Sequence, residues 1–185
     1  RRLQFLNINH AGAVPVFVEN EITISDSMAI FEYLEETHPE PKLLPNLPHQ
    51  RAEARRLTSW FDDKFHKEVT EKLLYERVYK KVAKTGYPSS EEIKLGIKNF
   101  KAHMEYMNWL LETRKWLAGD QMTIADFSAS AHLSSLDYIN DVDWSSYNYV
   151  KDWYSKIKSR PAFRPMLSDL LTGFNPPDHY SDLDF

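Results

Sequence analysis

Two pairs of neighbouring residues near the start of the chain could bind a small ligand. Val14-Pro15 opens a segment rich in β-branched residues, and Asp26-Ser27 precedes an apolar segment with helical spacing. A proline at the start of a strand removes a backbone donor. It is explained either by a sheet edge or by a cis bond that turns the Val14 N–H and C=O outward, toward an extended peptide ligand. The sequence leaves these two alternatives open.

Asp26-Ser27 lies where a helix is expected to begin. Free backbone N–H groups and the helix dipole favour an anion there, such as a ligand carboxylate, and Ser27 Oγ adds a donor. Asp26 could accept a hydrogen bond from a ligand ammonium group. The alternative is simple N-capping, which is the more common role of Asp and Ser at such a position. A ligand site is favoured only by the presence of both pairs in one hairpin–helix unit.

Two strands and one helix are expected to position these residues. Residues 14–18 and 21–24 predict a hairpin with a turn at Glu19-Asn20, and residues 27–37 predict an amphipathic helix. A two-stranded hairpin with one helix is marginal as an independent domain, and the later sequence predicts no further strand. The chain also opens on Arg1 instead of Met. We therefore expect that a preceding βαβ unit is missing from it.

The rest of the sequence predicts helices. Four prolines between His38 and Pro48, without apolar periodicity, predict a linker. Apolar residues then recur every four positions from Leu57 to Leu73, in a long helix that ends before Gly86. Capping boxes at Ser89/Glu92 and Thr123/Asp126 predict two more helix starts, and Ile93, Ile97, Phe100, Met104, Met107 and Leu110 form the expected buried face of the first. Shorter helices are expected around 147–159 and 162–171, before a polar tail at 175–185.

Composition excludes several classes of protein. The 185 residues are 42% hydrophobic and carry a formal charge of −4, which gives no reason to expect nucleic acid as a partner. The chain has no cysteine, so disulfides, thiolate metal sites and a cysteine nucleophile are excluded within it. The seven histidines lack metal-ligand spacing. Since neither a membrane span nor a signal peptide is evident, we expect a cytoplasmic protein without membrane insertion.

Three stretches of the chain resemble cytosolic glutathione transferases. Residues 5–17 and 24–34 resemble the family's glutathione-site segment, in which a cis proline follows a small or branched residue and an acidic residue and Ser precede an apolar helix. Trp116 to Asp126 resembles the capping-box motif of the family's helical domain. The resemblance implies an α+β thioredoxin-like domain, represented by its C-terminal half in 1–37, then a linker at 38–48 and an all-α bundle in 49–174.

This resemblance also implies a function and a set of binding residues. Val14 would hold the cysteinyl backbone of glutathione, Pro15 would be the cis residue, and Asp26 and Ser27 would bind the γ-glutamyl group. The chain would be a dimeric transferase that conjugates glutathione to an apolar electrophile. The family's catalytic Tyr, Ser or Cys lies in the segment that we expect to be missing, so the catalytic residue is unknown and enzyme activity stays open. Asp26 is one methylene shorter than the family's usual Glu, which shortens its reach.

A narrower resemblance concerns the tail from His179 to Phe185. It is similar to the acidic-aromatic terminus of the FzlA proteins of alphaproteobacteria, which are transferase-like dimers that bind the tubulin homologue FtsZ in cell division. The resemblance implies an alternative function, a non-catalytic dimer that binds FtsZ filaments. The candidate partner-binding residues are Asp182, Leu183, Asp184 and Phe185, with Tyr180 as a further apolar residue able to dock. A frayed terminus is the alternative interpretation.

Two further surfaces are candidates for binding. Arg51, Arg55, Arg56 and Phe61, on the first helix of the helical domain, are candidates for the two-fold contact of a dimer. Three tyrosines near the end of the long helix could line a pocket for an apolar co-substrate; they are Tyr75, Tyr79 and Tyr87. Ordinary amphipathic packing is the more common role of such tyrosines.

Overall fold

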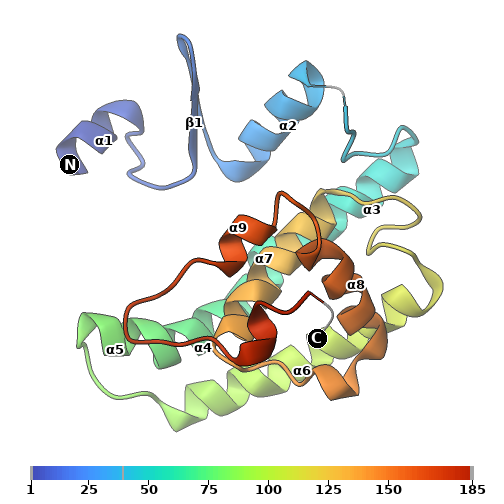
Figure 1. The fold of residues 1–185 in the computed structure, drawn as a ribbon. Coiled ribbons are helices and arrows are strands. Elements are labelled where there is room, and N and C mark those ends of the chain that lie inside the picture. Colours follow the sequence, from blue (N-terminus) through green and yellow to red (C-terminus); the bar gives the residue numbers. More distant parts are fainter. Residues whose placement is uncertain (1, 39, 184–185) are drawn as a thin grey trace. The chain divides into compact units, whose positions relative to one another are not determined.

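A computed structural model of the chain describes residues 2–38 and 40–183 (Figure 1). The chain forms two compact units, residues 1–44 and residues 45–185. The first unit contains α1 (Arg2–Ile8), β1 (Val16–Glu19), β2 (Ile22–Ser25) and α2 (Ser27–Thr37). Helix α1 was not predicted from the sequence. The bounds of α2 agree with the prediction, because an N-cap residue and an apolar stripe define them locally.

The hairpin is an antiparallel pair in which Val16 lies opposite Ser25 and Glu19 lies opposite Ile22. Its turn is therefore Asn20-Glu21, one residue later than predicted. Asn20 adopts a φ of 52°, in the left-handed region that asparagine tolerates better than most residues. This backbone preference explains why the strands reverse at Asn20 and not at Glu19.

Helix α2 packs on the hairpin through one aromatic pair and one hydrogen bond. The ring centroids of Phe17 and Tyr33 lie 5.9 Å apart, and the Tyr33 hydroxyl donates to Glu19 Oε2 over 3.0 Å. The Glu35 carboxylate accepts from the backbone N–H groups of Leu43 and Leu44, each over 3.0 Å. None of the residues of α2, all of which the structure describes, is buried. The small unit is thus held by specific polar contacts more than by a core.

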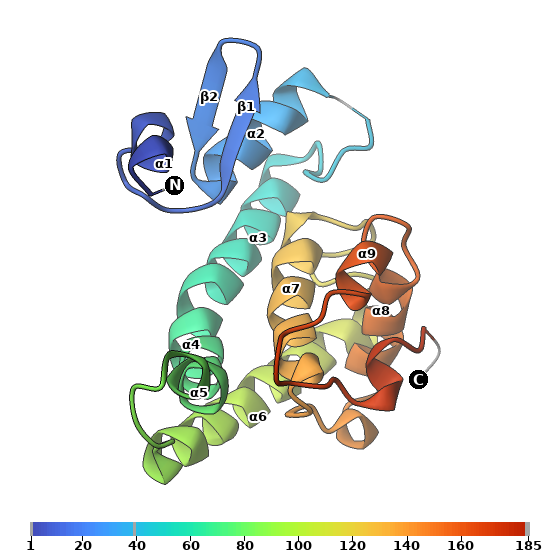
Figure 2. The ribbon, with the colours of Figure 1, turned by 60° about the vertical axis from the view of Figure 1, so that its left-hand side comes forward.

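The second unit is helical and begins with one long helical segment from Pro48 to Ala83. It consists of α3 (Pro48–Ser59), the π-helical η1 (Trp60–Thr70), α4 (Glu71–Leu74), the π-helical η2 (Tyr75–Tyr79) and α5 (Lys80–Ala83). Lys84 then ends the segment in the left-handed conformation, with a φ of 55°. The elements that follow are α6 (Ser90–Thr113), α7 (Ile124–Tyr138), η3 (Trp144–Ser146), α8 (Asn148–Lys158), α9 (Arg164–Leu167) and η4 (Asp178–Tyr180). Helices α6 and α7 both pack against the long segment (Figure 2).

The core of this unit is the predicted apolar stripe of the long segment. Leu57, Phe61, Phe65, Val69 and Leu73 are all 0% exposed. They meet buried residues of α6 and α7, among them Phe100, Met104, Met107, Ala129, Leu133 and Leu136. The predicted buried face of α6 is wrong at Ile97, which is 45% exposed. Helix α9 is also shorter than the expected 162–171.

The two predicted capping boxes differ in the structure. At Ser89 only half of the box forms, because Ser89 Oγ accepts from the N–H of Glu92 while the Glu92 side chain pairs with Lys72. At Thr123 the box is complete. The buried Asp126 carboxylate accepts there from Thr123 N and Oγ1, from Leu117 N and from Trp153 Nε1, over 2.8–3.2 Å. Burial raises the pKa of Asp126, and these hydrogen bonds oppose the increase.

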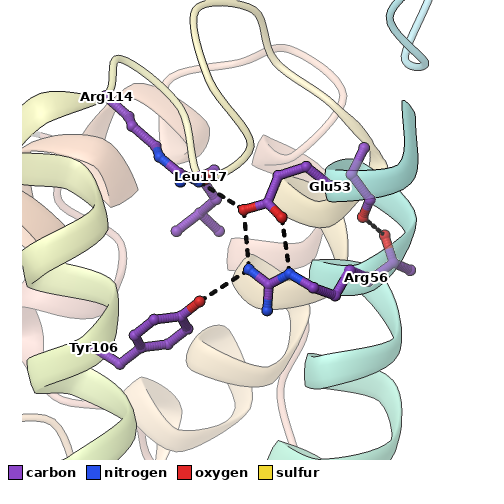
Figure 3. Close-up of polar contacts among 7 residues, drawn as sticks. Glu53, Arg56, Tyr106, Arg114 and Leu117 are labelled. Atoms are coloured by element: carbon purple, nitrogen blue, oxygen red, sulfur yellow. Dashed lines mark hydrogen bonds and ion pairs between the residues drawn. The ribbon is translucent and has the colours of Figure 1, made fainter. Parts of the chain in front are cut away.

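A polar network joins α3, α6 and the turn that follows α6 (Figure 3). The Glu53 carboxylate accepts two bonds from Arg56 over 2.8 and 2.9 Å and one from Arg114 over 2.9 Å. Arg56 also donates to the Tyr106 hydroxyl, and Arg114 to the carbonyl of Leu117, each over 2.9 Å. The guanidinium of Arg56, and then that of Arg114, lowers the pKa of Glu53 to about 2, against the opposing effect of burial.

We predict that Glu53→Gln lowers the free energy of unfolding by roughly 1–2 kcal/mol at neutral pH, because it removes charge-assisted hydrogen bonds. The folded-state pKa of Glu53 is depressed, so its stabilisation is present above the ordinary value of 4.5 and is lost as the pH falls toward about 2. Denaturant unfolding at several pH values should show the difference from the wild type shrinking below about pH 4.5. Glu112→Gln, at an exposed position of α6, is the control. A difference that grows on acidification would contradict the assignment.

Candidate functional site

The Val14–Pro15 peptide bond is cis, and the loop before it is fixed by a buried asparagine. Asn9 is 8% exposed; its Nδ2 donates to the carbonyl of Ala13 over 2.7 Å and its Oδ1 accepts from Ala11 N over 3.1 Å. Val14 itself is 80% exposed. The sequence left two explanations for Pro15, a sheet edge or a cis bond. The structure contains the cis bond, and the residue before it is open to solvent. Asn9 was missed by the sequence analysis, because nothing local marks an asparagine as a loop clamp.

Gly12 shapes the same loop. Its φ is 65°, in the left-handed region, and its N–H donates to the carbonyl of Asn9 over 2.9 Å. A Cβ at this position would lie 3.1 Å from Leu6 Cδ2, which is tighter than most Cβ contacts. Only glycine satisfies both conditions without strain. The loop that delivers Val14 therefore depends on Gly12 as well as on Asn9.

The hairpin brings the two sequence pairs together. Because Val16 at the start of β1 lies opposite Ser25 at the end of β2, Val14-Pro15 and Asp26-Ser27 extend from the same end of the ribbon (Figure 2). Val14, Asp26 and Ser27 are all exposed. The four predicted residues thus lie at the same end of the hairpin, where α2 begins.

Asp26 is the N-cap of α2. Its Oδ1 accepts from Met28 N over 2.9 Å and from Ala29 N over 3.1 Å, so the capping interpretation is confirmed. Its backbone has a φ of 83°, which is uncommon for any residue other than glycine and typically costs about 1–3 kcal/mol. Such strained residues cluster at ligand sites. Ser27 follows as the first residue of the helix, where backbone N–H groups favour anions.

The C-terminal tail is packed onto the helical unit through His179 and Tyr180. Tyr180 is 4% exposed, its hydroxyl hydrogen-bonds Ser134 Oγ over 2.9 Å, and its ring meets the Tyr138 ring edge-to-face at 5.2 Å. The frayed-terminus interpretation is therefore wrong for residues 178–180. Tyr180 docks into its own domain instead of presenting its ring to a partner.

The predicted partner-binding residues follow this docked turn. Asp182 is exposed, and its backbone N–H donates to the carbonyl of His179 over 3.2 Å. Leu183 is partly exposed. Asp184 and Phe185 lie outside the described residues. The described part of the segment is thus presented at a fixed place on the surface of the helical unit.

An apolar groove of about 450 Å³ lies beside Tyr180. It is lined by residues of the long helical segment, of α7 and of the chain after α8, including Leu74, Val78, Tyr79, Tyr138, Met166 and Leu170. A second groove, of about 440 Å³, is lined by Tyr79 together with Tyr75. These two tyrosines are 60% and 49% exposed, respectively. These two tyrosines are therefore pocket residues and not ordinary core. Tyr87 is 93% exposed.

Comparisons with known proteins agree with the two-unit architecture. Residues 1–42 match the family model of the glutathione S-transferase N-terminal domain, and residues 78–167 match that of the C-terminal domain. The chain is 46% identical to FtsZ-localized protein A of Caulobacter vibrioides, over 98% of this chain and 82% of that protein. The chain belongs to the glutathione S-transferase family. Its identity to FtsZ-localized protein A supports a place in the FzlA-like group of that family.

Other glutathione S-transferase relatives show the same fold. A solved glutathione S-transferase of Rhodospirillum rubrum has a TM-score of 0.94 and 48% identity, over 100% of this chain and 84% of that chain. FzlA from C. crescentus also has a TM-score of 0.94, with 44% identity, over 99% and 83% of the two chains. A probable maleylacetoacetate isomerase of Caenorhabditis elegans is 31% identical over 84% of this chain and 70% of that protein. The predicted fold, a small α+β domain followed by an all-helical one, is confirmed.

The dimer-contact residues suggested for this glutathione S-transferase family member need one correction. Phe61 is 0% exposed and packs with Phe65 inside the helical unit, so it cannot meet a second copy. Phe61 belongs to the apolar stripe that recurs every four positions along the long segment. This spacing was the signal that should have assigned it to the core. The sequence analysis instead missed an aromatic ridge of Trp60, Tyr106 and Trp109 on η1 and α6.

Within residues 2–38 and 40–183, no cluster of three or more His, Cys, Asp or Glu side chains could hold a metal ion. Among the same residues, no helix combines the length and the apolar character that crossing a membrane requires.

Proposed function

We propose that this chain is a non-catalytic, FtsZ-binding member of the glutathione S-transferase family that acts in the cytoplasm during bacterial cell division. The observation that carries the proposal is the 46% identity to FtsZ-localized protein A, which extends over 98% of this chain. The docking of Tyr180 and His179 onto the helical unit supports it, because a tail packed in this way can present a binding segment.

In this proposal, residues 182–185 are the segment that contacts FtsZ. Asp182 supplies a negative charge that would select a basic groove, and Leu183 adds an apolar side chain beside it. Asp184 and Phe185 repeat the same acidic-then-apolar pattern in the sequence. Because residues 178–180 are already ordered, the segment leaves the protein surface from a defined point, which lowers the entropic cost of binding.

Co-sedimentation with polymerised FtsZ tests this function. We expect the wild type to pellet with the filaments, deletion of residues 182–185 to abolish pelleting, and Asp182→Asn to weaken the affinity about tenfold, which corresponds to 1.4 kcal/mol. Asp182→Lys should be weaker still, although it also brings a cation near Lys158. Asp178→Asn, at an exposed position of the same tail, is the matched control. Wild-type affinity in both the deletion and Asp182→Asn would contradict the proposal.

A second candidate function is glutathione binding and transfer, and the geometry around Val14 favours it. We propose that the exposed Val14 backbone, directly before the cis bond to Pro15, pairs with the cysteinyl part of glutathione, while Ser27 and the strained cap Asp26 bind the γ-glutamyl group. Asp26 Oδ1 already accepts two backbone bonds, so Oδ2 would face the ligand ammonium. An apolar electrophile would bind to the helical unit, in one of the two grooves that Leu74 and Tyr79 line.

Calorimetric titration with glutathione tests the second function independently of FtsZ. We expect binding by the wild type at millimolar ligand and at least a several-fold weaker affinity for Ser27→Ala, because a hydrogen bond to a charged ligand group typically contributes about 1.5–3 kcal/mol. Ser25→Ala, at an exposed hydroxyl two residues earlier, is the control. The absence of any binding heat for the wild type would remove this function and leave the FtsZ proposal intact.

Both functions are proposed for a homodimer that uses the aromatic ridge. The Tyr106 and Trp109 rings stack with their centroids 6.0 Å apart, and the Trp60 ring centroid lies 5.0 Å from that of Tyr106. Trp109 is 62% exposed. A large exposed aromatic residue on such a ridge is typical of an interface.

Sedimentation velocity tests this interface. We expect a dimer for the wild type at micromolar concentration and a monomer for Trp109→Glu, which would bury a charge against the ridge. Leu170→Glu, at a residue that is 77% exposed outside the ridge, should stay dimeric. A monomeric wild type would refute the dimer.

A further inference from the structure

A buried charge near the end of α7 and another at the end of α8 both contact the C-terminal tail. Asp137 is 0% exposed, and its Oδ1 accepts from Trp144 Nε1 over 2.8 Å and from His179 Nε2 over 2.9 Å. Lys158, the last residue of α8, is also 0% exposed, and its Nζ donates to the backbone carbonyl of His179 over 3.0 Å. One tail residue therefore bonds both charges, with its ring on the carboxylate and its carbonyl on the ammonium group.

Burial makes these contacts important. An ionised group without hydrogen bonds is costly in a protein interior, and the cost is offset only when partners with good geometry surround it. Burial lowers the pKa of Lys158, and the negative charges of Asp137 and Asp182 oppose that decrease. Removing the tail would take one hydrogen bond from each buried charge. Docking of the tail is thus coupled to the stability of the helical unit.

Tyr180 completes the attachment through different chemistry. Its ring packs edge-to-face on Tyr138, and its hydroxyl hydrogen-bonds the buried Ser134 of α7. The two backbone bonds of the turn, from Tyr180 N to Pro177 O and from Asp182 N to His179 O, then fix the direction in which the chain continues. We name the contacts of His179 with Asp137 and Lys158, together with the Tyr180–Ser134 bond, the tail latch.

We propose that His179 is a positioning residue, which holds the tail latch closed and thereby directs the segment that begins with Asp182 and Leu183 toward the binding partner. This inference rests on the proposed FtsZ function. A closed latch orders the backbone of the turn before binding, so a partner does not have to offset the entropy cost of that ordering. With the latch open, that segment would be attached to a free chain end.

A series of three variants, each assayed in two ways on the full protein, tests the latch. His179→Ala removes the ring that bonds Asp137, His179→Gln keeps a donor at a similar reach, and Tyr180→Phe removes only the hydroxyl. Hydrogen exchange at the amides of Tyr180 and Asp182 reports the docking of the tail. Co-sedimentation with FtsZ reports the binding. Asp178→Ala is the control for a mutation in the tail, and thermal unfolding verifies that each variant is folded.

We expect His179→Ala to exchange faster at both amides and to bind FtsZ roughly tenfold more weakly, a change that corresponds to ordering about one residue. His179→Gln should restore both properties, and Tyr180→Phe should lie between. Faster exchange with unchanged FtsZ binding would overturn the positioning role while leaving the FtsZ proposal standing. Unchanged exchange in His179→Ala would overturn the latch itself. A wild type that does not bind FtsZ would refute the FtsZ proposal and the positioning role with it.

Discussion

The helical unit is organised around one buried carboxylate at the start of α7. Asp126 accepts hydrogen bonds from the turn at Leu117, from the N-cap Thr123 and from the indole of Trp153 on α8. The turn before α7, its N-cap and, 27 positions later in the chain, α8 are thereby fixed to the first turn of one helix. A buried carboxylate is tolerated only with such a complete set of donors, so none of these segments can shift without leaving it under-bonded. The position of α7 in the unit follows from this constraint.

The other end of α7 holds a second buried carboxylate, of which Oδ1 is bonded and Oδ2 has no hydrogen-bond partner among the described residues. Asp137 is also fully buried and also accepts from an indole, that of Trp144. Whereas the partners of Asp126 all lie within the helical bundle, Asp137 takes a further hydrogen bond from the C-terminal tail through His179. One helix therefore stabilises the bundle at its first turn and holds the tail at its last turn. Its N-terminal carboxylate is a structural centre, while its C-terminal carboxylate connects the bundle to the segment proposed to bind FtsZ.

Those parts of the structure that depend on local signals could be predicted from the sequence. The bounds of α2 follow from Asp26 and the apolar spacing after it, and the complete capping box at Thr123 follows from residue types three positions apart. Contacts between distant residues could not be predicted. His179 meets Asp137 across 42 positions, and Tyr180 meets Ser134 across 46, so the tail looked like a polar terminus. Whether those side chains are buried is decided by tertiary packing alone.

The predicted glutathione-binding residues and the tail are held in place by different kinds of contact, and this bears on how the two candidate functions relate. Val14, Pro15, Asp26 and Ser27 are exposed residues of a unit that has little core, and local bonds from Asn9 and Asp26 maintain their geometry. The tail instead depends on buried charges of the helical unit. Within residues 2–38 and 40–183, the hydrogen bonds that hold one site share no residue with those that hold the other, so substitutions in one should leave the other unaffected. A member of this family can therefore lose or retain a small-molecule site on the hairpin without altering a partner site on the helical unit.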